Sequence, residues 1–186
     1  MTSTALHPLP GDILAVWTGN SLPDEAIRVG AVIEGQSGLN NHVVGMHHWT
    51  DGVAWGIEGK PGGVGWADIT RYLEDPHTTH NIDQEKTLDE RDAICKGGEV
   101  LLGTPYDWEA ISDDTLTALH LPYLFNPLSH HDGWDGDGSN LAPTHVVCSS
   151  LWAYLYGKVK LAHPTVHPLR LCTPADWTEF NLSRKW

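Results

Sequence analysis

Cys148 is the residue whose surroundings most clearly favour chemistry. It follows a short apolar run and directly precedes residues 149–157, whose apolar side chains recur at helical spacing up to Gly157. Unpaired backbone N–H groups and the positive end of the helix dipole meet a thiol at this position, and both favour the nucleophilic thiolate. A lone cysteine is more often a small buried apolar residue. The sequence must therefore supply a base before Cys148 is read as a nucleophile.

A predicted β-hairpin nearer the N-terminus contains the candidate base. Residues 42–49 and 53–59 are rich in strand-forming side chains, and a turn that ends in Gly52 separates them. Gly52 suits the left-handed position of a three-residue hairpin loop, so we expect the loop to be residues 50–52. Gly157 is similarly placed to end the helix after Cys148 as a left-handed cap.

The side chains of this hairpin suggest two partners for a thiol. With a three-residue loop Val44 pairs with Glu58, which places Glu58 on the same sheet face as His42, whereas a two-residue loop would separate them. His42 can then accept the proton of Cys148, and Glu58 can orient the imidazole and stabilise its cation. His48 shares the face of His42 in a regular strand and is the alternative third group.

Composition limits the classes of partner. The chain has 11 Lys and Arg against 24 Asp and Glu, a formal net charge of −13, and no basic run, so neither nucleic acid nor an anionic membrane is an expected partner. No stretch approaches the roughly 20 apolar residues of a membrane span, and residues 1–10 lack a secretory signal. Three scattered cysteines predict a reducing compartment, hence a cytoplasmic protein, with release by phage-mediated lysis as an alternative.

Length and local patterns predict one α+β domain over residues 1–186. The other expected elements are a strand over 12–17, a helix capped by Ser21, a short helix over 68–73, a strand over 79–83, a helix from a Thr87–Glu90 capping box with an inward stripe of Ala93, Ile94, Gly97 and Leu101, a short helix capped by Ser112, a strand over 166–171 and a helix starting at Thr173-Pro174. The irregular residues 109–143 are expected to be an insertion or lid.

Several short motifs follow one another in a recognisable order. They are Gly11-Asp12-Ile13, Asn41-His42-Val43, Ile57-Glu58-Gly59 with Gly63-Val64, Gly103-Thr104-Pro105-Tyr106-Asp107, Val147-Cys148-Ser149-Ser150 and Thr173-Pro174-Ala175-Asp176. Over about residues 11–178 the chain thereby resembles the circularly permuted branch of the NlpC-like papain-fold cysteine hydrolases, which includes the lecithin:retinol acyltransferase-like proteins. The resemblance implies a papain-like fold with a small antiparallel sheet packed against the nucleophile helix.

The resemblance also implies roles for individual residues. Cys148 would be the nucleophile, His42 the base and Glu58 the orienting group, with Tyr106 near the substrate. The chain departs from the family's pattern at two positions, Ser150, where Glu is frequent, and Val44, where Gly is usual.

Other polar and aromatic clusters are weaker candidates. Trp55 and Trp134 are candidate groove-lining residues. His77, His80 and the run His130-His131-Asp132 have the donor types of a zinc site, but solvated loop residues are the better interpretation, and we predict no metal and no cofactor. Residues 135–140 lack the Gly and Glu of a calcium loop.

The expected function is cysteine-dependent hydrolysis of an amide or peptide bond through a thioester, with a small peptide or amide as substrate. Cell-wall-type peptides are what the resemblance implies. Two alternatives stay open: an acyltransferase or thioesterase of the lecithin:retinol acyltransferase-like kind, and a non-catalytic binding or structural protein, such as a phage component, that retains the fold.

Overall fold

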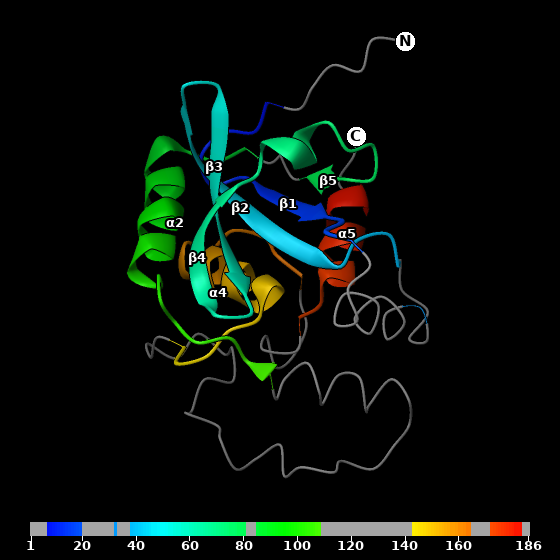
Figure 1. Ribbon diagram of the computed structural model, residues 1–186. Helices are drawn as coiled ribbons and strands as arrows, with labels where there is room; N and C mark the ends of the chain where they lie inside the picture. Colours follow the sequence, from blue (N-terminus) through cyan, green and yellow to red (C-terminus); the bar gives the residue numbers. More distant parts are fainter. Residues whose placement is uncertain are drawn as a thin grey trace, which may run out of the picture.

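An antiparallel sheet of five strands forms the centre of the computed structural model, which describes residues 7–19, 32, 38–80, 85–108, 143–164 and 172–183 (Figure 1). The strands lie in the order β4-β3-β2-β1-β5. Their bounds are β1 Ile13–Val16, β2 His42–Thr50, β3 Val53–Lys60, β4 Gly63–Asp68 and β5 Thr79–His80. The α-helices of the described residues are α2 Leu88–Val100, α4 Cys148–Lys158 and α5 Pro174–Ser183, and a 3-10 helix, η1, spans Thr70–Leu73. The fold class is therefore α+β, as predicted.

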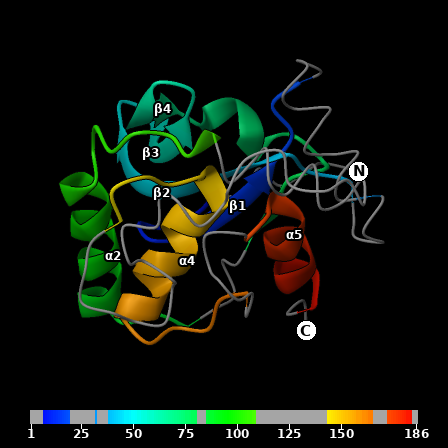
Figure 2. The same ribbon diagram turned by 90° about the horizontal axis from the view of Figure 1, so that it is seen from below.

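The three α-helices lie against one face of the sheet, and η1 lies against the other. Figure 2 shows α4 between α2 and α5 across one face. Side chains alternate along β1, so that Ile13 belongs to the apolar cluster under α4, whereas Leu14 belongs to the cluster under η1. The same alternation in β2 sends Val43 toward α4 and Val44 toward η1. Both faces of the central strands are thus buried.

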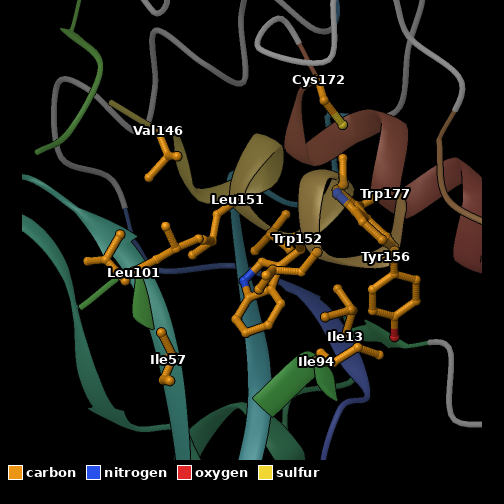
Figure 3. Packing of buried hydrophobic residues seen from close by; sticks show 14 of the residues in the cluster. Ile13, Ile57, Ile94, Leu101, Val146, Leu151, Trp152, Tyr156, Cys172 and Trp177 are labelled. Carbon is orange, nitrogen blue, oxygen red and sulfur yellow. The ribbon is translucent and has the colours of Figure 1, made fainter. Parts of the chain in front are cut away.

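Helix α4 packs closely on β2. Leu151, Trp152 and Leu155 are all buried, as the helical pattern predicted. Trp152 lies in the middle of the cluster (Figure 3). A Cβ at Gly45 of β2 would come within 2.2 Å of its ring. Only glycine at this position lets the indole lie directly on the strand.

Strand β4 was not predicted, because residues 61–73 read as a break followed by a short helix. The structure has a tight turn at Pro61-Gly62, with Lys60 paired to Gly63, and the strand continues to Asp68 before η1 begins. Glycine weakens strand patterns in sequence, and two of the first three residues of β4 are glycine.

Helix α2 begins as predicted, and its inward face differs from the predicted one at Ala93. Thr87 accepts a hydrogen bond from the Glu90 N–H (3.2 Å), and the Glu90 carboxylate accepts one from the Thr87 N–H (2.7 Å). The predicted inward position of Ala93 is wrong, because this residue is exposed, whereas Ile94 and Cys95 are buried. The Thr173–Asp176 side chains cap α5 in the same reciprocal way.

The end of α4 also differs from the prediction. Gly157 is still helical and is not a left-handed cap; the helix ends at Lys158, and the positive φ of 58° falls on Lys160. Gly157 instead offers a surface without a side chain to His163, whose Nε2 lies 3.4 Å from the position of a Cβ there.

Several predicted features lie outside the described residues: the helix after Ser21, the short helix after Ser112, the strand over 166–171, Trp134, the run His130-His131-Asp132 and nearly all of the 109–143 insertion. Among the helices that are described, none is both long and apolar enough to cross a lipid bilayer.

The Gly45–Trp152 contact gives a stability prediction. Gly45→Ala forces a methyl group into the indole, and overpacking of this kind costs about 1–3 kcal/mol. We expect a lower midpoint in urea denaturation. Gly65→Ala is the matched control, because a Cβ there meets nothing closer than the Lys60 Cε at 3.9 Å. Equal stability of the two variants would contradict the packing described here.

Candidate active site

His42 and Glu58 form a buried pair on adjacent strands. His42 is the first residue of β2, and Val44 pairs directly with Glu58 of β3, so the His42 and Glu58 side chains are diagonal neighbours on one face. The His42 Nε2 lies 2.8 Å from the Glu58 Oε2. The residues are 8% and 9% exposed, respectively. The predicted pairing of Val44 with Glu58 is confirmed.

The route to this register differs from the predicted one. The loop contains two residues, Asp51 and Gly52, with φ of 51° and 80°, and Thr50 pairs with Val53. Both φ values are positive, as in a type I′ turn. A bulge between Met46 and His48 then shifts the register by one residue. The prediction of a three-residue loop is therefore wrong, and the bulge compensates for the shorter loop.

Cys148 is the first residue of α4 and lies where β2 and β3 separate. The pairing of β2 with β3 stops at Val44 and Glu58, although β3 continues to pair with β4 as far as Lys60. A Cβ at Gly59 would lie 3.3 Å from the Cys148 N and Cα, so glycine lets the helix start approach the strand. The backbone N–H of Val43 hydrogen-bonds to the sulfur.

The thiol and the imidazole are directly coupled. His42 hydrogen-bonds to Cys148, and because its Nε2 faces Glu58, its Nδ1 is the nitrogen left for the sulfur. Burial raises the pKa of the Cys148 thiol, but the charge of His42, its hydrogen bond and the Val43 N–H bring that pKa below its ordinary value. Burial lowers the pKa of His42, whereas Cys148 and then Glu58 raise it to about 10. A thiolate beside an imidazolium is the favoured state.

Several contacts fix the start of α4. The Ser150 Oγ accepts a hydrogen bond from the Val147 N–H (3.1 Å), which caps the first turn. The Ser149 hydroxyl donates to the Cys172 carbonyl, and the Trp177 indole N–H donates to the Ser149 carbonyl (3.0 Å). Ser150, one of the two departures from the family's pattern, thus has a structural partner within its own helix.

Sequence reasoning missed Lys60. Its Nζ lies 3.0 Å from the Glu58 Oε1, so both carboxylate oxygens have a partner. Burial raises the pKa of Glu58, but His42 and then Lys60 lower it below the ordinary value. Lys60 follows Glu58 by two positions, and strand alternation was the signal that places the two side chains on one face.

The predicted substrate-binding residues are placed differently from one another. Tyr106 forms a parallel bridge with Val146, and the Asp107 backbone N–H donates to the Val146 carbonyl (3.0 Å), so this turn pairs with the segment that leads into α4. Trp55 pairs with His48 near the hairpin loop. Alternation along β3 puts Trp55 on the face opposite that of Glu58, and Trp55 lies at the hairpin end of β3, whereas Gly59, at the other end, lies against Cys148.

His48 does not share the face of His42, which corrects the prediction that it could be the third group. The bulge at His47 reverses the alternation, and His48 pairs with Trp55. The His48 Nδ1 lies 2.9 Å from the His47 Nδ1, and the Trp66 ring packs edge-on against both imidazoles. In the described structure Glu58 is the group on the outer nitrogen of His42.

Cys95 has the surroundings of a structural cysteine. Burial raises its pKa to about 11.

Among the described residues, which include His77 and His80, no group of three or more His, Cys, Asp or Glu side chains has an arrangement suited to a metal ion.

Comparison with known proteins gives no assignment: no protein-family model matches the chain, and no curated protein matches it.

The coupling of Cys148 to His42 predicts how the thiol titrates. In the wild type, we expect ultraviolet thiolate absorbance, measured as the difference from Cys148→Ser, to persist below the usual thiol pKa of about 8.5. His42→Ala removes the cation and its hydrogen bond and leaves burial, so the signal should appear only above that value. His77→Ala, at an exposed histidine, is the control and should match the wild type. Identical titration in His42→Ala would contradict the coupling.

Proposed function

We propose that this chain is a cysteine-dependent hydrolase of amide or peptide bonds with a circularly permuted, NlpC-like papain fold. One observation carries the proposal: a buried thiol in the first turn of α4 hydrogen-bonds to His42, whose other nitrogen lies 2.8 Å from Glu58. An activated thiol, a base and an orienting carboxylate are what nucleophilic catalysis of acyl transfer requires. The order of the short sequence motifs supports the same reading.

The first half of the reaction transfers the acyl group to sulfur. The Cys148 thiolate attacks the carbonyl carbon of the amide and forms a C–S bond. The His42 imidazolium protonates the leaving nitrogen as the C–N bond breaks, which releases an amine and leaves a thioester. Glu58 keeps the Nε2 proton of His42 in place and stabilises the cation when it forms.

The second half returns the enzyme to its starting state. His42, now neutral, takes a proton from water while the water oxygen attacks the thioester carbonyl. The C–S bond then breaks, the acid is released and the thiolate–imidazolium pair is restored. In both halves an oxyanion develops on the carbonyl oxygen. The Cys148 backbone N–H, at the first position of α4, has no intrahelical acceptor and is the natural donor to it.

The substrate class follows in part from the nucleophile and in part from the family resemblance. The thioester chemistry fits small peptides and amides, and cell-wall-type peptides are the specific proposal. The net charge of −13 favours substrates with a free amino group over polyanions.

Hydrolysis of a panel of dipeptides and γ-linked amides tests the proposal. Activity, measured as released amine, should fall at least about 10³-fold in Cys148→Ala and in His42→Ala, because residues of a nucleophile–base pair act as a unit. Glu58→Gln should lose less, as the third group does in other triads. Cys95→Ser is the control and should retain activity.

Two results would overturn the assignment. Activity that survives both Cys148→Ala and His42→Ala would exclude the mechanism. Turnover of thioesters or acyl lipids by a chain that ignores every amide would favour the acyltransferase or thioesterase alternative.

A further inference from the structure

We propose that Lys60 is a positioning residue: it holds the Glu58 carboxylate in the orientation that His42 requires and keeps it ionised while His42 changes charge. This inference rests on the proposed function, since it concerns the same thiol and imidazole.

The geometry of β3 brings Lys60 to the site. The Glu58 Oε2 lies 2.8 Å from the His42 Nε2, and the Oε1 lies 3.0 Å from the Lys60 Nζ. Lys60 follows Glu58 by two positions on β3, so strand alternation puts the two side chains on the same face. The carboxylate is therefore held at both oxygens, with its plane fixed between two cations.

The neighbouring strand leaves room for the lysine to fold back. Gly65 of β4 pairs with Glu58, and a Cβ at Gly65 would lie 3.9 Å from the Lys60 Cε. The lysine stem thus runs past a position without a side chain, and its ammonium reaches the carboxylate. The Lys60 side chain is 46% exposed, whereas that of Glu58 is 11% exposed, so the cation has access to water and the carboxylate has little.

The catalytic cycle explains why a second cation matters. During acyl transfer the His42 imidazolium gives its proton to the leaving group, and Glu58 then faces a neutral ring. A buried carboxylate without a cation tends to take up a proton. Arg71 of η1 also acts on Glu58 through its charge, but Lys60 is the cation that hydrogen-bonds to the carboxylate. Lys60 keeps its charge throughout the cycle, so Glu58 stays ionised and is ready to stabilise the next imidazolium.

The pH dependence of Cys148 alkylation by iodoacetamide tests this role without a known substrate. In Lys60→Met, Glu58 loses a cation and protonates at higher pH. The imidazolium and the thiolate then lose stabilisation, so the acid limb of the labelling profile should move to higher pH. Near this limb we expect labelling about two- to fivefold slower than in the wild type, the range of one partly exposed ion pair. Lys60→Arg should restore the profile.

Controls separate this effect from net charge and from misfolding. Lys96→Met removes the same charge on α2, where Lys96 pairs with Asp92 on the exposed surface, and should leave the profile unchanged. Lys60→Gln is a second uncharged variant and should repeat the shift of Lys60→Met. Thermal melts of each variant should match the wild type, because Lys60 is half-exposed.

A double-mutant cycle shows whether Lys60 acts through Glu58. Adding Lys60→Met to Glu58→Gln should cause no further shift, since the carboxylate that Lys60 positions is gone. A shift that persists in the Glu58→Gln background, or an unchanged profile in Lys60→Met, would overturn the inference while leaving the proposed function intact. Wild-type Cys148 that reacts no faster than Cys95 near pH 6 would remove the activated nucleophile and both proposals with it.

Discussion

The candidate site depends on one constraint: β2 and β3 stop pairing before the first residues of β2 and the last residues of β3. Pairing ends at Val44 and Glu58, and the start of α4 occupies the space beyond that pair. A backbone N–H released from a sheet in a buried place needs another acceptor. For Val43 that acceptor is the Cys148 sulfur, and the same hydrogen bond favours the thiolate. One contact thus satisfies a buried N–H at the end of the sheet pairing and lowers the pKa of the thiol. Glycine at position 59 lets the start of α4 lie against β3.

Charge alternates along the four side chains that meet at this point, of which Cys148, His42 and Glu58 are buried. Cys148, His42, Glu58 and Lys60 form a chain of anion, cation, anion and cation, and each neighbour offsets the desolvation of the next. A buried charge is tolerated when it is paired and hydrogen-bonded, whereas removing one partner leaves the other uncompensated. Substitution of either inner residue, His42 or Glu58, therefore leaves a charged neighbour on each side without its partner. The outer end of the chain reaches water through the half-exposed ammonium of Lys60.

Local signals in the sequence were sufficient for some of these features. The Thr87–Glu90 capping box, the buried stripe of α4 and the position of Cys148 at a helix start all follow from neighbouring residues. Features set by tertiary contacts were not predictable in this way. Ile94 is buried and Gly97 lies against Leu155 as predicted, with a Cβ there 2.6 Å from the leucine side chain, but α2 turns the predicted inward residue Ala93 to solvent and buries Cys95. Strand β4 was not predicted, because its glycines have no side chains and the alternation of apolar and polar residues is lost.

The bulge at His47 shows how a correct pairing can follow from an incorrect loop. With a two-residue loop and a regular ladder, Glu58 would lie on the face opposite His42. The extra residue restores their common face, and it also turns His48 toward Trp55. The histidines of β2 then meet different environments: Cys148 and then Glu58 raise the pKa of His42 against the effect of burial, whereas burial, opposed by Glu99, lowers that of His47. One inserted residue therefore places Glu58 on the same face as the His42 imidazole and moves His48, the alternative third group, to the other face.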